Sequence, residues 1–174
     1  MRSVKALLSL VGVLATAACS HPTDAALLDR FQRHKSELNQ LVQMFEADRG
    51  LGRVGDRFTR PDDPGLVGVS TQRIQEYRKL CARVGASACI EGYDATFDRL
   101  YGPVQPGRTE EKNPIWIHVS GLGLSISGST KGFLYSKAPP FEVVTDLDRV
   151  SPSRSGTWIR HIEGPWYLYF DYED

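Results

Sequence analysis

The stretch IWIHVSGLGLSISGSTKGFLYS, residues 115–136, decides the fold because its apolar residues recur at every second position. Such alternation is the pattern of a β-strand that buries one face. The alternating apolar residues are Ile115, Ile117, Val119, Leu122, Leu124 and Ile126. We expect the glycine-containing residues 128–132 to turn the chain into a second strand at residues 133–136. The stretch therefore predicts an antiparallel meander.

The C-terminal part of the chain predicts a final hairpin. Residues 138–140 (Ala-Pro-Pro) break the alternation, and residues 145–156 read as a long connection. A strand is expected to begin at residues 157–162, followed by a turn at Gly164 and Pro165. The last strand has large apolar residues on both faces, which favours a position with neighbouring strands on both edges. Its two sets are Trp166, Leu168 and Phe170 on one face, and Tyr167 and Tyr169 on the other.

Upstream of the strands, residues 23–49 repeat their apolar positions with the spacing of an amphipathic helix. Pro22 and Asp24 favour a helix start at Thr23, and Gly50 favours a helix end just before it, at Arg49. We expect this helix to pack on the domain's own sheet rather than in a coiled coil. His34 lies on the apolar stripe, where a histidine with one satisfied nitrogen is commoner than a ligand. The apolar positions are Leu27, Leu28, Phe31, Leu38, Leu41, Val42 and Phe45.

A second helix is expected between Ser70 as N-cap and Gly85 as C-terminal glycine. Residues 50–69 and 102–114 are rich in glycine and proline and predict loops. Residues 86–101 fit a short strand at 88–93 or a helical turn at 95–101. The element order predicts an α+β fold, in which a long N-terminal helix and a second helix pack on a C-terminal antiparallel sheet made of the meander and the terminal hairpin.

The N-terminus predicts export. Arg2 and Lys5 precede an apolar run at residues 6–15, which is too short to span a bilayer and is typical of a signal peptide over residues 1–18. The ending Thr16-Ala17-Ala18-Cys19 resembles the lipobox of bacterial lipoproteins. That resemblance implies cleavage before Cys19 and acylation of its thiol and amine, with palmitate among the chains. Thr16 replaces the commoner leucine, so ordinary cleavage after Ala18 is the alternative.

The same resemblance implies a location. Ser20 follows the cysteine, where an Asp tends to hold lipoproteins at the inner membrane of diderm bacteria. We therefore expect a lipid anchor in the outer membrane, with the protein facing the periplasm. Removing residues 1–18 leaves 156 of the 174 residues, which suits one domain over residues 19–174 with 19–22 as a tether. The remaining 19 basic and 21 acidic residues show no basic stripe, which argues against a nucleic-acid partner.

Cys81 and Cys89 are expected to form a disulfide, because disulfides persist outside the cytoplasm and Gly85 allows the short loop to turn. Two separately buried thiols are the alternative. A zinc site is disfavoured because no CxxC spacing is present. Other motifs predict no cofactor or metal. The glycine spacing of residues 123–130 lacks the lysine of a P-loop, no nucleophile elbow frames the serines near His118, and Asp146 and Asp148 suggest solvated or capping carboxylates.

An aromatic and polar set on the strands is the candidate binding face, if the helices cover the other face of the sheet. A small domain also needs aromatic core residues, and on base rates that interpretation comes first. The set comprises Trp116, His118, Tyr135, Trp158, His161, Tyr167 and Tyr169.

Two classes of function follow from these features. The first is a lipid-anchored, non-catalytic binding or assembly module that recognises an envelope protein, a toxin or a cell-wall component. The alternative is an envelope hydrolase that uses His118 or His161 with Asp146 or Asp148. The element order also resembles cystatin-like and nuclear-transport-factor-like domains, some of which bind small ligands, but element order does not determine function. Residues 131–135 (KGFLY) and 166–170 (WYLYF) resemble segments of uncharacterised bacterial proteins, which implies no activity.

Overall fold

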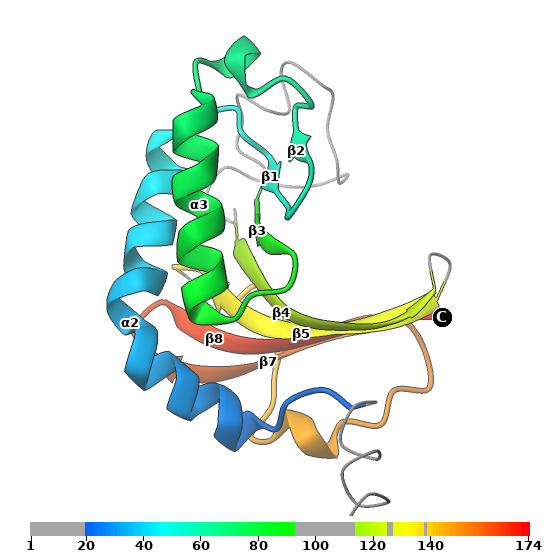
Figure 1. Cartoon of the computed structure of the whole chain (residues 1–174). Helices are drawn as coiled ribbons and strands as arrows, with labels where there is room; N and C mark the ends of the chain where they lie inside the picture. The colour runs from blue at the N-terminus through cyan, green and yellow to red at the C-terminus, as the bar shows by residue number, and fades with distance from the viewer. Residues whose placement is uncertain (1–19, 93–113, 125–126, 138) are drawn as a thin grey trace, which may run out of the picture.

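Two helices cover one face of a strongly curved sheet (Figure 1). The computed structural model describes residues 20–92, 114–124, 127–137 and 139–174. Within these residues the sheet has eight strands in the order β2-β1-β3-β4-β5-β8-β7-β6, and all pairs but β6 with β7 are antiparallel. The strands are β1 (Arg53–Val54), β2 (Thr59–Arg60), β3 (Cys89–Glu91), β4 (Ile115–Leu124), β5 (Ser127–Tyr135), β6 (Glu142–Val143), β7 (Gly156–Glu163) and β8 (Trp166–Glu173). The α+β prediction is confirmed.

Helix α2 (Asp24–Ala47) begins where the sequence predicts. The Thr23 hydroxyl accepts a hydrogen bond from the amide of Ala26 at 3.2 Å, which satisfies one of the unpaired amides of the first turn. The helix ends two residues before the predicted end, and Gly50 lies beyond it with a φ of 82°. His34 has non-helical backbone angles and marks a kink, so the helix bends as it follows the sheet.

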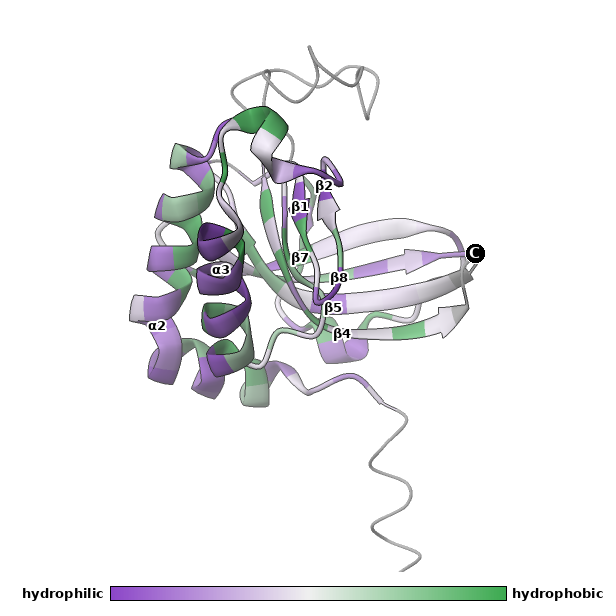
Figure 2. Cartoon of the chain, turned by 45° about the horizontal axis from the view of Figure 1, so that its top comes forward, coloured by the Kyte–Doolittle hydropathy of each residue, from purple (hydrophilic) through white to green (hydrophobic). Residues whose placement is uncertain are grey.

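Helix α3 (Thr71–Val84) confirms both predicted ends. The Ser70 hydroxyl accepts from the amide of Arg73, and Gly85 adopts the left-handed conformation with a φ of 66°. The helix buries its apolar side against α2 and the sheet, and its exposed side is mostly hydrophilic in Figure 2. The buried residues are Ile74, Tyr77, Leu80, Cys81 and Val84.

The strands differ from the sequence prediction at β5, at β1 and β2, and at β6, which the sequence did not predict. Residues 128–132 belong to β5 rather than to the predicted turn, since β4 ends at Leu124 and β5 begins at Ser127. Residues 50–69 are not only loop, because β1 and β2 pair there and a short 3-10 helix, η2 (Pro64–Val67), follows. Two-residue strands are too short to show alternation. The strand predicted near residues 88–93 is present as β3, and the predictions for residues 93–101 and 102–113 lie outside the described residues.

The terminal hairpin forms as predicted. Strands β7 and β8 join at Gly164, and β8 lies between β5 and β7, which confirms neighbours on both edges. A second 3-10 helix, η4 (Leu147–Arg149), lies in the long connection before β7. Among the described residues, no helix has the combination of length and apolar character needed to cross a membrane.

The two faces of the sheet bury different cores. On the helix face, Ile117, Phe133 and Leu168 are fully buried with the apolar sides of α2 and α3. On the far face, a smaller cluster forms around Leu134, Ile159 and Tyr169, all fully buried. Because side chains alternate along a strand, the β4, β5, β7 and β8 pairings determine which residues share each face.

Candidate functional site

The seven residues of the candidate binding face do not form one surface. Tyr135 and Trp158 lie on the helix face, where Tyr135 packs edge-on against Trp166 and Trp158 stacks on Phe170. The other five share the far face. The strand register explains this division, because Tyr135 pairs with Ile115 of the helix face rather than with Trp116. The far-face members are Trp116, His118, His161, Tyr167 and Tyr169.

The far-face tyrosines are core residues. Tyr169 is fully buried and Tyr167 is 6% exposed. The Trp116 ring packs edge-on against Tyr169 with the centroids 4.8 Å apart, and it also contacts Phe141 at 5.3 Å. For these two tyrosines the core interpretation holds. Trp116 and His118 are partly buried, and His161 is exposed.

A hydrogen-bonded chain connects the polar groups of this far face. The Tyr169 hydroxyl lies 2.6 Å from Nδ1 of His118, and Nε2 of His118 lies 3.2 Å from Oε2 of Glu91. Nε of Arg53 lies 3.1 Å from the same Glu91 oxygen. A neutral imidazole with its proton on Nε2 satisfies this arrangement, since the tyrosine then donates to Nδ1 and Nε2–H donates to the carboxylate.

Gly132 allows this chain to form. Tyr169 and His118 lie on strands that are not neighbours, with Gly132 of β5 paired to both. A Cβ atom at Gly132 would come within 3.0 Å of the Tyr169 ring and 2.1 Å of the Ile117 carbonyl oxygen. The absence of a side chain therefore lets the tyrosine ring cross β5 and reach the histidine.

The chemistry available to this chain of groups is limited. Burial raises the pKa of the Tyr169 hydroxyl well above its usual value of 10.0, and the charges of Asp171 and Glu91 add to that effect. A buried hydroxyl that resists ionisation is a poor nucleophile. Both imidazole nitrogens of His118 have partners within the protein. Hydrogen bonds join Tyr169, His118 and Glu91, and Arg53 is ion-paired with Glu91, which is the behaviour of a structural network.

The hydrolase pairing expected from the sequence does not form in the structure. His118 pairs with Glu91 on the far face, whereas Asp148 bonds to Lys131 on the helix face. His161 lies with Nε2 3.0 Å from the carbonyl oxygen of Gly164, in its own hairpin turn. Asp146 caps η4 by accepting from the amide of Asp148 at 3.0 Å, as the capping interpretation predicts.

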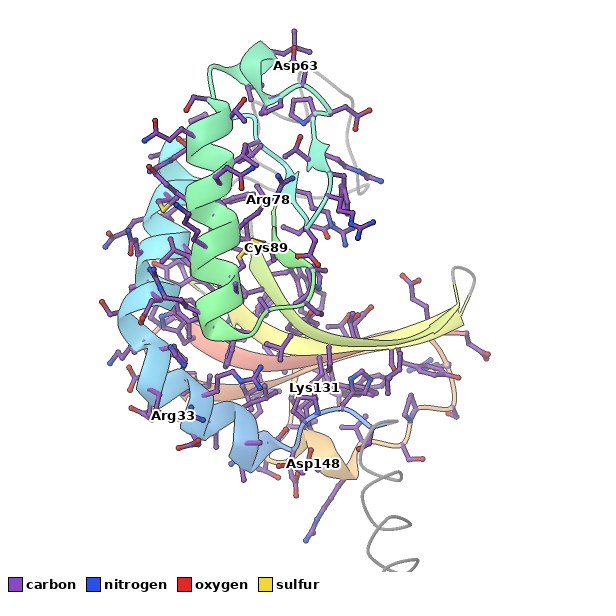
Figure 3. The ribbon with its side chains drawn as sticks, viewed as in Figure 1. Arg33, Asp63, Arg78, Cys89, Lys131 and Asp148 are labelled. Atoms are coloured by element: carbon purple, nitrogen blue, oxygen red, sulfur yellow. A yellow bond between two sulfur atoms is a disulfide. The ribbon has the colours of Figure 1, made fainter. Side chains whose placement is uncertain are left out.

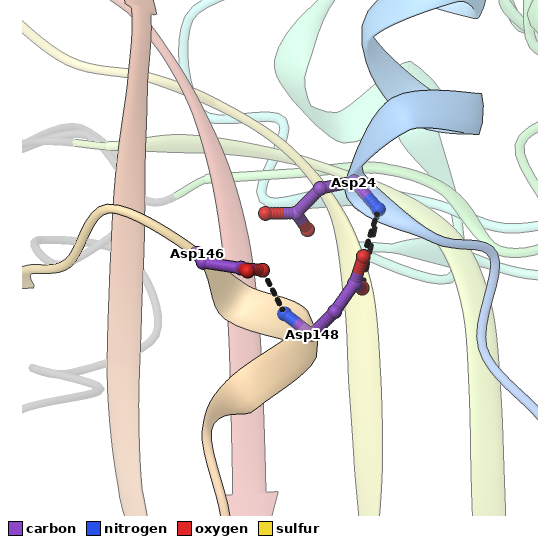
Figure 4. A group of neighbouring side chains, drawn as sticks. All are labelled: Asp24, Asp146 and Asp148. Carbon is purple, nitrogen blue, oxygen red and sulfur yellow. Dashed lines mark hydrogen bonds between the residues drawn. The ribbon is translucent and has the colours of Figure 1, made fainter.

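A second polar cluster, the N-terminal clasp, lies on the helix face where α2 begins (Figure 3). The Lys131 ammonium is 2.8 Å from Oδ1 of Asp24 and 2.6 Å from Oδ1 of Asp148, and both Lys131 and Asp24 are almost fully buried. Arg160 donates to Oδ2 of Asp24 at 2.9 Å, as does the amide of Leu147. Asp148 in turn accepts from the backbone amide of Asp24 (Figure 4).

The charges of the clasp balance. Burial by itself would raise the pKa of Asp24, but the hydrogen bonds from Lys131, Arg160 and the Leu147 amide outweigh it and lower that pKa. Oxygen atoms of Asp24, Asp146 and Asp148 lie within 4.8 Å of one another, a spacing that could hold a metal ion. The Lys131 ammonium already supplies the positive charge between Asp24 and Asp148. We therefore regard the clasp as structural.

His21 is fixed beside the clasp. Its Nδ1 lies 2.6 Å from the hydroxyl oxygen of Ser120, and its Nε2 lies 2.7 Å from that of Ser129. The ring also packs edge-on against Phe170 at 5.6 Å. Burial and then the charge of Lys131 lower the pKa of this histidine. Neither His21 nor the clasp was expected from the sequence. One sequence feature could have indicated the clasp. Lys131 is charged, yet it is two residues before Phe133 and therefore lies on the same, buried face of the strand.

The predicted disulfide is confirmed. Cys81 near the end of α3 is bonded to Cys89 at the start of β3, with the Cα atoms 5.2 Å apart. Cys89 has a φ of 58°, an uncommon conformation for a residue with a side chain. The bond ties the second helix to the strand that carries Glu91 of the far-face network.

Comparison of the chain with protein-family models, with curated proteins and with solved structures finds no match.

Proposed function

We propose that this protein is a lipid-anchored binding or assembly module on the periplasmic side of the outer membrane. The lipobox-like ending at Cys19 supports the anchor, and the absence of Asp at position 20 supports the outer membrane as its location. The support for binding without turnover is the closed network of His118, in which both ring nitrogens have protein partners. This closure is the observation that carries the proposal, because the hydroxyl that His118 faces belongs to Tyr169, which is fully buried and whose raised pKa makes it a poor nucleophile.

The proposed recognition surface is the accessible part of the far face. Trp116, Leu134, Tyr167 and His161 form one row across four neighbouring strands. Leu134 and Tyr167 are buried and support the row, while Trp116 at one end is partly exposed and His161 at the other is exposed. Strand spacing puts these ends about 14 Å apart. Tryptophan and histidine present both apolar surface and a hydrogen-bonding tip, which suits an envelope protein or a cell-wall component.

The recognition surface is tested by substitution. We expect Trp116→Ala and His161→Ala to weaken binding of the purified mature protein to envelope proteins or isolated cell wall. Leu66→Ala is the matched control, because Leu66 is 72% exposed and lies outside the row. Equal loss in all three variants, or full binding by both far-face variants, would contradict the surface. Each variant's melting temperature must match that of the native protein.

The same preparation tests the other two elements of the proposal. Intact-mass analysis of protein extracted from membranes is expected to show acyl groups on a chain that begins at Cys19. An unmodified soluble chain would refute the anchor. Hydrolysis of wall or lipid substrate that disappears on His118→Ala or His161→Ala, at unchanged stability, would replace the binding function with an enzymatic one.

A further inference from the structure

The distance between the expected lipid and the folded domain is short. Consecutive Cα atoms are 3.8 Å apart, so residue 19 lies at most about 7.6 Å from the Cα atom of His21. Ser20 is the one residue between them. The headgroup layer on each side of a bilayer is roughly 5–8 Å thick. A lipid on Cys19 would therefore bring His21 to the level of the headgroups.

His21 has little freedom to move away from the sheet. Its two ring nitrogens bond to serines of β4 and β5, and its ring packs on Phe170 of β8. These contacts attach the residue to three strands of the domain. The chain has therefore joined the folded structure two residues after the expected lipid attachment.

The clasp continues this attachment. Pro22 and Thr23 separate His21 from Asp24, which is 2% exposed and is ion-paired with Lys131 and Arg160. The Asp24 amide bonds to Asp148 of η4. Between His21 and the start of α2 the chain thus has no slack that would act as a flexible linker.

We propose that the domain lies directly on the phospholipid surface in a set orientation, with η4 and the segment at His21 against the headgroups. This inference rests on the lipid anchor proposed above. His21 and Lys131 lie on the helix face of the sheet, so the opposite face, with Trp116 and His161, is turned away from the bilayer. The end that carries β1, β2 and η2 lies opposite η4 and points away from the membrane as well (Figure 1).

This orientation limits how far from the membrane a partner can be bound. Helix α2 has 24 residues and is about 36 Å long, which sets the scale of the domain. Without a linker, the recognition surface stays within roughly that height of the membrane. The partner must therefore approach the outer membrane itself, as an envelope protein seated there or wall material lying close to it would.

The orientation can be measured by fluorescence quenching on vesicles. The lipidated protein is reconstituted into phosphatidylethanolamine and phosphatidylglycerol that carry a quencher near the headgroups. A bimane label is placed by Arg149→Cys in η4 or by Leu66→Cys in η2, both strongly exposed positions. Since Cys81 and Cys89 are bonded to each other and Cys19 is expected to be acylated, the introduced thiol is the one labelled. We expect several-fold stronger quenching at position 149 than at position 66.

A linker variant makes the test specific. Inserting about ten Gly and Ser residues between Ser20 and His21 adds roughly 17 Å of reach. The quenching at position 149 is expected to fall towards that at position 66, while the acyl mass stays the same. Equal quenching at both positions in acylated protein, or no effect of the linker, would overturn this inference alone. A chain without acyl groups would overturn the anchor and this inference together.

Discussion

The two polar clusters lie on opposite faces of the same sheet and are built on different principles. In the far-face network, hydrogen bonds connect Tyr169 to His118 and His118 to Glu91. Its central group is a neutral imidazole, so no charge is buried there. The clasp instead buries a carboxylate and an ammonium, and joins residues that are up to 136 positions apart. Removing the partner of a buried charge lowers the free energy of unfolding more than removing the partner of a neutral hydrogen-bonded group does. A substitution in the clasp should therefore destabilise the protein more than a substitution in the far-face network.

The largest expected effect is that of Lys131→Met. The change leaves Asp24 and Asp148 without the ammonium between them, and breaking a buried pair typically costs about 3–5 kcal/mol. The free energy of unfolding from urea denaturation measures it. Arg149→Met is the control, because the Arg149–Asp146 pair is exposed and such pairs contribute about 0–1 kcal/mol. Similar losses in both variants would show that the clasp is no more than a surface pair.

A smaller effect is expected from Gly132→Ala in the far-face network. The added Cβ would lie 2.1 Å from the Ile117 carbonyl oxygen and 3.0 Å from the Tyr169 ring, and such overpacking costs about 1–3 kcal/mol. Gly121→Ala, on the same face, is the matched control because its Cβ would meet Thr130 at an ordinary 3.5 Å. Thermal unfolding of the two variants gives the comparison. If the two variants have the same melting temperature, the network does not depend on the close approach of the strands at Gly132.

The smallest effect is a pH dependence that belongs to the clasp. The pKa of Asp24 is lowered from 3.8, so the unfolded state binds the proton more readily than the folded state. The resulting stabilisation is complete above that value and is lost as the pH falls through the lower folded pKa. We expect Asp24→Asn to flatten the acid limb of the stability profile measured by urea denaturation. An unchanged acid limb would mean that other carboxylates determine it.

Local sequence signals predicted a large part of the fold. The N-caps Thr23 and Ser70, the left-handed Gly85 and the alternation in residues 115–124 each act within a few residues, and all appear in the structure. The Cys81–Cys89 bond was predictable for the same reason, because its partners are close along the chain. The turn expected at residues 128–132 was wrong because Gly132 serves a close approach between strands instead.

The candidate site was predicted less well. Alternation divided the residues of β4, β5, β7 and β8 between two faces of each strand. It could not show which residues of different strands share one face of the sheet. The pairing of Tyr135 with Ile115 puts Tyr135 on the opposite face from Trp116, and the register shift between His118 and Ser120 puts Ser120 beside Lys131 on the helix face. A shift of one residue reverses every later side chain, so membership of a face is a long-range property.

The sequence by itself determined the two long helices, the strands β4, β7 and β8, and the disulfide, because periodicity, capping and short loops act between near neighbours. Only the tertiary structure decided that Lys131 meets Asp24, that Tyr169 crosses Gly132 to reach His118, and that His21 is held by two serines. Those contacts join residues far apart in the chain. Their energies depend on burial and on strand register, which exist only once the sheet has formed.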